Sequence, residues 1–209
     1  MRKIVLTLLV LLPISVFCQR KWETGLAVKI DKLNYIRNYN LVADLSTGLE
    51  LSKLWYKESV HVFSLVKEFG LSLNYSPIDY SYGGMGAGGS VDGFIVRTVA
   101  FASVIPQVRI RKTFYIQAGP RIEGLVAGYR DIIIDSWGMP GFNCSSGRAH
   151  HSGFSRDYFN DIYYGLSLRI LKTINKKKVG ISTNFMRTKE TDEEKETDKT
   201  LGFAINYYF

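Results

Sequence analysis

The chain has 209 residues, a formal net charge of +8 at pH 7 and 2 cysteines, and 46% of its residues are hydrophobic. This length fits one domain and excludes two large ones. The moderate charge requires no nucleic-acid partner, and beyond the N-terminal segment no window holds the roughly 18 continuous apolar residues of a membrane helix.

Residues 1–18 have the pattern of a cleaved secretory signal. Arg2 and Lys3 precede an apolar run, Ile4 to Phe17, that is too short to cross a bilayer. We therefore expect residues 19–209 to form the mature domain. The alternative is a lipoprotein with a lipidated Cys18, against which the bulky Phe17 argues. Only Cys144 would then remain, so we expect no disulfide within the chain.

Apolar and polar residues alternate with a period of two in eight later segments. The predicted strands cover residues 22–30, 45–56, 62–75, 96–110, 114–123, 163–170, 179–186 and 201–209. In the first strand Leu26 and Ile30 share one face, whereas Ala27 and Lys29 share the other. An even number of strands, most of them about 9–11 residues long, is typical of a transmembrane barrel.

The connections alternate between short and long. Short turns are predicted near Lys57, Lys112 and Lys177, and their basic residues suit the lipid phosphates of a periplasmic rim. Long loops are predicted over residues 31–40, over the glycine-rich segment Pro77 to Gly93, from about Ile132 to Asn160, and over the charged segment Lys189 to Lys199. Short turns on one rim and long loops on the other are the plan of an outer-membrane barrel.

The polar face of the strands decides between two kinds of barrel. A soluble eight-stranded barrel with an apolar interior is the alternative. The polar face here is rich in Gly, Ser, Thr and Asn, which suits a small filled lumen, and Trp22, Trp55 and Tyr75 near strand ends suit interfacial girdles. We therefore predict an all-β fold, an eight-stranded antiparallel up-and-down transmembrane β-barrel in the cell outer membrane.

Charged residues on the polar face should lie in the lumen. The predicted lumen charges are Glu50, Arg109, Arg121, Glu123 and Arg169. An unpaired charge in so narrow an interior would be costly, so we expect these groups to neutralise one another. Eight strands leave room for side chains and little else, which argues against a diffusion porin.

The ligand-type side chains do not converge on a site. Cys144, His150 and His151 lie close together in sequence, but adjacent histidines point apart on an extended backbone, so we predict no metal site and no cofactor. The glycine run from Gly83 to Gly89 lacks the Lys-Ser or Lys-Thr of a phosphate loop. The rim residues that could serve an embedded hydrolase or acyltransferase are Asp131, Asp135, Ser136, His150, His151, Asp157 and Asp161. Solvation alone accounts for such polar residues, so we expect no enzyme.

Residues Val99 to Arg130 read VAFASVIPQVRIRKTFYIQAGPRIEGLVAGYR. This pair of strands, with Ile105-Pro106 in the first and Ala118-Gly119-Pro120 in the second, resembles the PorT-like outer-membrane β-barrel family of Bacteroidota. The resemblance implies insertion by the barrel assembly machinery, with Phe209 and Tyr207 in its recognition signal, and it implies no reaction.

The expected role is structural or interactive. We predict a barrel embedded in outer-membrane lipid whose outward loops contact a partner protein of the envelope, a glycan or a neighbouring cell. Because the PorT-like name is attached to a component of type IX secretion, the first alternative is a subunit of a secretion or envelope assembly. The second is the rim-located lipid hydrolase or acyltransferase.

Overall fold

The computed structural model describes residues 20–33, 45–57, 62–84, 87–138, 147–154, 162–188 and 199–209. It contains nine strands: β1 (Arg20–Leu33), β2 (Ser46–Lys57), β3 (Phe63–Gly84), β4 (Ala87–Arg111), β5 (Phe114–Gly138), β6 (Gly147–Phe154), β7 (Ile162–Ile174), β8 (Lys177–Thr188) and β9 (Lys199–Tyr208). Among these described residues, no helix is long and apolar enough to cross a membrane. The predicted signal segment 1–18, Cys144, Asp157 and Asp161 lie outside the described residues.

Eight of the strands form a closed antiparallel ring, which confirms the predicted barrel. The order is β4-β3-β2-β1-β9-β8-β7-β5, and pairing between β4 and β5 closes it. The last strand pairs with the first from Gly25 opposite Tyr208 to Leu33 opposite Thr200. Thr24 and Phe209 extend this ladder by exchanging two backbone hydrogen bonds of 2.9 Å. Closure pairs the backbone N–H and C=O groups of the edge strands, which could not remain unpaired in lipid.

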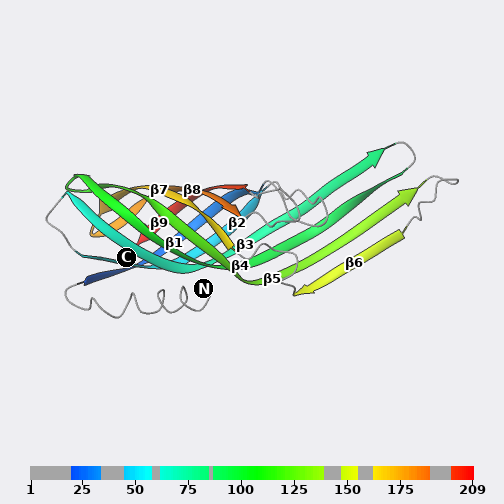
Figure 1. The fold of residues 1–209 in the computed structure, drawn as a ribbon, viewed down its shortest axis with the longest axis horizontal. Helices are drawn as coiled ribbons and strands as arrows, with labels where there is room; N and C mark the ends of the chain where they lie inside the picture. Colours follow the sequence, from blue (N-terminus) through cyan, green and yellow to red (C-terminus); the bar gives the residue numbers. More distant parts are fainter. Residues whose placement is uncertain are drawn as a thin grey trace.

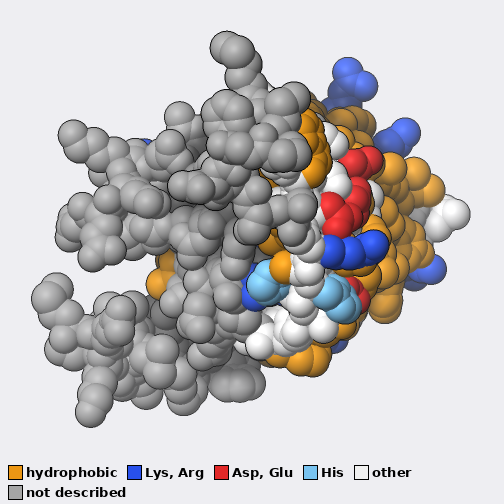
Figure 2. Space-filling model, turned by 90° about the vertical axis from the view of Figure 1, so that its right-hand side faces the viewer, with side chains coloured by type: hydrophobic (Ala, Val, Ile, Leu, Met, Phe, Trp, Pro, Cys, Tyr) orange, Lys and Arg blue, Asp and Glu red, His pale blue; other side chains and the backbone are white. Residues whose placement is uncertain are grey.

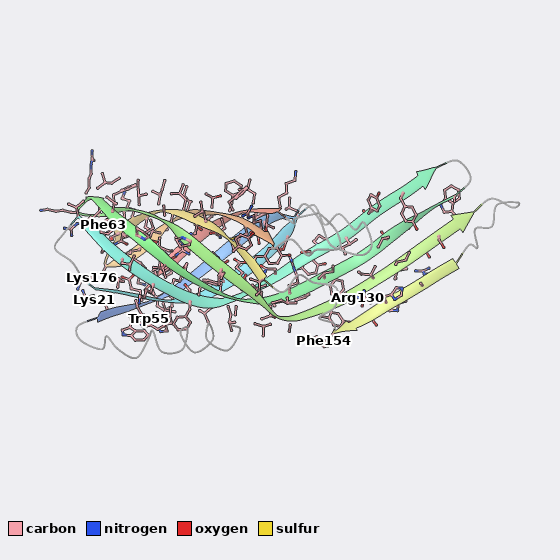
Figure 3. The ribbon with its side chains drawn as sticks, viewed as in Figure 1. Lys21, Trp55, Phe63, Arg130, Phe154 and Lys176 are labelled. Carbon is pink, nitrogen blue, oxygen red and sulfur yellow. The ribbon has the colours of Figure 1, made fainter. Side chains whose placement is uncertain are left out.

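The turns at one end are tight. Asn175 and Lys176 connect β7 to β8 with φ angles of 49° and 68°, the positive values that a two-residue hairpin turn of the primed type requires. Lys112 and Thr113 connect β4 to β5 at the same end. Figure 3 shows Lys176 and Phe63 at this end of the barrel, far from Phe154.

Alternation places apolar residues on the outer wall and polar residues inside. On β1, Leu26, Val28 and Ile30 are exposed on the outside, whereas Ala27 and Lys29 are buried. β9 follows the same rule, with Phe203 and Ile205 outside. A band of exposed aliphatic and aromatic side chains around a closed barrel is the surface that meets hydrocarbon.

Aromatic side chains border this band at both ends. Near the tight turns, Trp55 packs between Trp22 and Phe69, with ring centroids 4.5 and 4.2 Å apart. At the other end a continuous aromatic row crosses four strands, with successive centroids 5.6, 6.1 and 5.2 Å apart. This row consists of Tyr75, Phe94, Tyr129 and Phe154. Aromatic girdles of this kind lie at the two bilayer interfaces.

Beyond the aromatic row, β3, β4 and β5 continue past the ring and β6 adds to the edge of β5 (Figure 1). We call this four-stranded sheet the blade: residues 76–84, 87–95, 129–138 and 147–154. Two predictions were therefore wrong. The segment Pro77 to Gly93 is strand except for residues 85–86, which are not described, and the segment from Ile132 to Asn160 contains the end of β5 and all of β6.

Glycine and a bulge explain where the sheet bends into the blade. Val126 of β5 is an extra residue, because Thr98 pairs with Ala127 and Val99 pairs with Leu125. Such a bulge bends its strand and raises the local twist. Gly93 has a φ of +149°, and a Cβ there would lie 2.1 Å from the carbonyl oxygen of Asp131. Only glycine allows this close approach.

Candidate functional site

The predicted lumen charges Glu50, Arg121 and Glu123 form one cluster at mid-barrel. Arg121 Nη2 donates to Glu50 Oε1 at 2.6 Å, and Arg121 Nε donates to Glu123 Oε1 at 2.7 Å. The guanidinium also stacks over the Phe101 ring, 3.8 Å from its centroid. These contacts come from β2, β4 and β5, so the cluster ties opposite sides of the barrel together.

A second cluster surrounds Arg169 of β7. Its Nη2 donates to Glu68 Oε2 at 2.5 Å, and its Nη1 donates to the Tyr208 hydroxyl at 2.9 Å. The Ser103 hydroxyl donates to the same Glu68 oxygen at 2.9 Å. Sequence reasoning did not single out Glu68, although its even position on β3 shares the inward face with Ser72 and Asn74 and could have identified it.

Two lysines complete the ionic interior. Lys29 Nζ lies 2.9 Å from Asp31 Oδ2 and 3.4 Å from Glu50 Oε1. Lys178 Nζ lies 2.9 Å from Glu23 Oε2 and sits over the Tyr56 ring. Lys178 thus follows the predicted basic turn near Lys177, but its even position on β8 turns its side chain inward, where it is buried.

Arg109 lies apart from these clusters. It is half-buried near the turn between β4 and β5, and its backbone N–H donates to the Val62 carbonyl oxygen at 2.7 Å. It shares the inward face of β4 with Ser103 and Gln107, which are buried. Arg109 is thus placed at the end of the lumen that bears the tight turns.

Apolar side chains fill that end of the lumen. Leu54, Val66, Ile105, Leu171 and Tyr208 form a buried cluster inside the ring. Above it lie the two ionic clusters, so buried apolar side chains and buried ion pairs follow one another along the lumen. Such packing favours a structural barrel over a wide aqueous channel.

A groove of about 650 Å³ lies on the outer wall. Apolar side chains of β4, β5, β7 and β8 form it, among them Ala102, Val104, Pro120, Leu166 and Phe185. It lies within the membrane-facing band and below the level of the blade. We therefore attribute it to contact with acyl chains and not to a reaction site.

Ionisable side chains gather on the outer face of the blade. His150 Nε2 of β6 lies 2.7 Å from Asp131 Oδ1 of β5, and Arg148 Nε lies 3.6 Å from Asp135 Oδ1. Figure 2, viewed from the blade end, shows histidine side chains beside acidic and basic ones. Figure 3 places Phe154 at the base of the blade.

Two further carboxylates face each other on the same surface. Asp79 of β3 and Asp92 of β4 are direct partners in the ladder, and both are exposed. The Ser90 hydroxyl donates to Asp92 Oδ2 at 3.4 Å. Like charges placed directly opposite one another destabilise a sheet, so this pair weakens the blade unless a cation approaches it.

In the described part of the blade, the predicted rim residues His150 and Ser136 have separate hydrogen-bond partners. Of the described residues, none places a hydroxyl nucleophile within hydrogen-bond distance of His150, whose partner is Asp131. The Ser136 hydroxyl instead donates to the Gly147 carbonyl oxygen at 3.1 Å. No group of three or more His, Cys, Asp or Glu side chains that could hold a metal ion occurs within the described segments.

Comparisons with known proteins found no matching protein-family model and no matching curated protein. Solved structures similar to this chain include neisserial surface protein A, with 8% identity and a TM-score of 0.44, covering 91% of this chain and 99% of that one. The attachment invasion locus protein Ail of Yersinia pestis has 12% identity and a TM-score of 0.36, covering 91% and 97%. The N-terminal β-barrel domain of Pseudomonas aeruginosa OprF has 7% identity and a TM-score of 0.38, covering 91% and 100%.

The surface of the barrel itself assigns its location. A closed antiparallel ring leaves no open sheet edge among its eight strands, and it combines a polar, ion-paired interior with an exposed apolar band and aromatic borders, as a barrel in lipid requires. The tight turns lie at one end and the blade at the other, as in barrels whose turns face the periplasm. The chain is therefore an outer-membrane β-barrel protein.

Proposed function

We propose that this protein is an outer-membrane anchor that presents the blade to the outside of the cell as an interaction surface. The observation that carries the proposal is the continuity of β3, β4 and β5 from the membrane into the blade (Figure 1). Because there is no linker between the two parts, a partner bound to the blade is held rigidly at the membrane surface.

The outer face of the blade favours a partner with cationic groups. Asp131 and Asp135 are engaged with His150 and Arg148, whereas Asp79 and Asp92 face each other. A basic protein or peptide surface of the envelope, or of a neighbouring cell, would relieve that repulsion. The partner is thus bound through its cations, and binding should weaken as salt concentration rises.

Membership of the PorT-like family is part of the same proposal. Its support is the segment Val99 to Arg130, which covers the C-terminal half of β4, the turn after it and the N-terminal part of β5. Here the regular pairing is interrupted between Ser103 opposite Arg121 and Gln107 opposite Gln117, around Pro106 and Pro120. Proline lacks the N–H that a ladder needs, so the motif marks a local break in the barrel wall.

The first experiment tests the topology. In a Cys144→Ser background, single cysteines are introduced at Ser90 and Ser152 on the blade and at Lys112 in a tight turn. A membrane-impermeant maleimide applied to intact cells should label the two blade positions, and Lys112→Cys only after permeabilisation. Labelling of Lys112→Cys alone would reverse the orientation and overturn the proposal.

The second experiment tests the interaction. A photo-crosslinking residue at Ser90 should capture an envelope partner in intact cells, whereas the same residue at lipid-facing Leu71 should not. The double variant Asp79→Asn, Asp92→Asn should reduce the Ser90 adduct at least severalfold. Equal amounts of adduct from the Ser90 and Leu71 probes would contradict an acidic docking face. So would a Ser90 adduct that is unchanged in the Asp79→Asn, Asp92→Asn variant.

A further inference from the structure

The groove on the outer wall carries one exposed positive charge. Two charged residues, Arg121 and Arg187, belong to its lining. Arg121 is buried and is engaged with Glu50 and Glu123. The Arg187 side chain is exposed, and its guanidinium lies over the Tyr164 ring, 4.9 Å from the ring centroid. The lining therefore offers a ligand one accessible cation beside an apolar surface.

Arg187 and Tyr164 lie at the end of the wall that is remote from the tight turns. β7 and β8 are joined by the turn at Asn175 and Lys176, and Arg187 is the last residue but one of β8. Tyr164, its partner in the ladder, is the third residue of β7. Aromatic and basic side chains at strand ends meet the lipid head groups, whose phosphates attract cations.

The apolar part of the groove reaches from this end to the break in the ladder between β4 and β5. Leu166 and Phe185 are 63% and 55% exposed, and Val104 and Pro120 belong to the interval without regular pairing. The volume of about 650 Å³ lies within the range of ligand pockets, roughly 300–1,000 Å³. A flexible hydrocarbon chain can follow such a surface from Arg187 toward the middle of the wall.

We propose that this groove is a binding site for one phosphorylated glycolipid of the lipid A class, with an acyl chain in the groove and a phosphate on Arg187. A guanidinium stacked on an aromatic ring keeps its N–H groups in plane for a bidentate contact with phosphate. The inference rests on the orientation proposed above, because the end remote from the tight turns then lies in the outer leaflet, which contains this glycolipid.

The first test measures the charged contact. The barrel, refolded in detergent micelles, is titrated with purified lipid A and followed by native mass spectrometry. The wild type should bind one lipid A molecule, and Arg187→Gln should raise the dissociation constant about tenfold, because a charge-assisted contact is lost. Lys172→Gln, which removes an exposed lysine of β7 near the tight turns, is the control and should bind as the wild type does. Heat-modifiable migration verifies that each variant is folded.

The second test fills the groove without changing its charge. Ala102→Phe adds a ring to the groove lining and should weaken lipid A binding severalfold. Val28→Phe adds a ring to the exposed outer wall of β1, outside the groove, and should not. Unchanged affinity in Arg187→Gln or in Ala102→Phe would overturn the proposal. An equal loss in Lys172→Gln would do the same, since it would indicate attraction by any surface cation.

The third test identifies the lipid that the protein retains. Wild-type protein extracted from outer membranes in mild detergent should carry lipid A, and Arg187→Gln should carry severalfold less. Retention of a phospholipid in its place would overturn the assignment. The maleimide experiment tests the orientation separately. If the blade cysteines are labelled and lipid A does not bind, the groove proposal fails and the anchor proposal stands.

Discussion

Glu50 of β2 and Arg121 of β5, 71 residues apart in sequence, meet inside the barrel with Arg121 Nη2 2.6 Å from Glu50 Oε1. Both side chains are almost completely buried, and Glu50 also lies 3.4 Å from Lys29 Nζ. The pair therefore connects two walls of the ring at the level where the lumen is most strongly charged.

Breaking this pair should destabilise the barrel. Glu50→Gln leaves Arg121 and Lys29 without their shared carboxylate, so the free energy of unfolding should fall by about 3–5 kcal/mol. Urea unfolding of the refolded protein in micelles, followed by tryptophan fluorescence, measures the loss. Arg148→Gln, on the exposed face of the blade, is the control and should change barrel stability by less than about 0.5 kcal/mol. A similar small change for Glu50→Gln would mean that the ionic clusters do not hold the ring together.

A charge on the outer wall should be costly within the membrane band. Ile205→Arg places a guanidinium on the outer wall, where Ile205 is 65% exposed, and the free energy of unfolding in bilayers should fall by about 2–4 kcal/mol. Ser81→Arg, on the blade, is the control and should have little effect. Equal effects of the two substitutions would place β9 outside hydrocarbon.

The bend at Gly93 should tolerate only glycine. In Gly93→Ala the new Cβ would lie 2.1 Å from the Asp131 carbonyl oxygen, at a φ that alanine rarely adopts. We expect the blade to lose amide protection in hydrogen exchange while the barrel keeps its protection. Gly84→Ala is the matched control, because no heavy atom lies within 4 Å of its Cβ position. Loss of protection throughout the barrel would show that the blade does not open independently.

The aromatic ring of Phe209 should matter for assembly more than for stability. Phe209 keeps both backbone hydrogen bonds to Thr24 when it is replaced by alanine, so the refolded Phe209→Ala barrel should unfold near the wild-type midpoint. In cells, the heat-modifiable folded form in the outer membrane should decrease severalfold. Phe203→Ala removes a similarly exposed ring from the same strand and serves as the control. If both variants assemble equally well, the terminal ring is not part of the insertion signal.

Relief of the carboxylate pair should stabilise the blade. Asp79→Asn removes the charge opposite Asp92, and protection of the blade amides should increase by an amount equivalent to about 0.2–1 kcal/mol. The effect should shrink in high salt, because exposed charges are screened there. Decreased protection in Asp79→Asn would instead indicate that the two side chains share a proton or an ion.

The barrel was predictable from sequence because every ring strand separates lipid from a polar interior. Apolar and polar residues therefore alternate in segments such as residues 201–209. The same alternation assigns Glu50, Arg121 and Arg169 to the lumen face. The alternation does not predict that Glu68 is the partner of Arg169. That contact crosses the lumen from β3 to β7, so it depends on the tilt of the strands around the ring. Arg97 likewise has the phase of a lumen residue, and the structure shows that its side chain is buried there.

The blade was not predictable in the same way. Both of its faces carry polar residues, and Gly83, Gly84, Gly88 and Gly89 contribute no side chains to any alternation. Its strand conformation is set by the ladder that continues out of the barrel, which is a tertiary effect. The bulge at Val126 also shifts the phase of β5 by one residue, so Asp131 and Tyr129 share a face that extrapolation from Arg121 would assign to the lumen.

The uninterrupted passage of β3, β4 and β5 from membrane to blade has a mechanical consequence. A pull on the blade along its long axis acts parallel to the strands and loads many rungs of the wall ladder in shear at once. Peeling a strand from an edge would break those rungs one after another at much lower force. The continuous strands therefore suit the blade to withstand pulling forces at the cell surface, because the ring anchors them in the membrane.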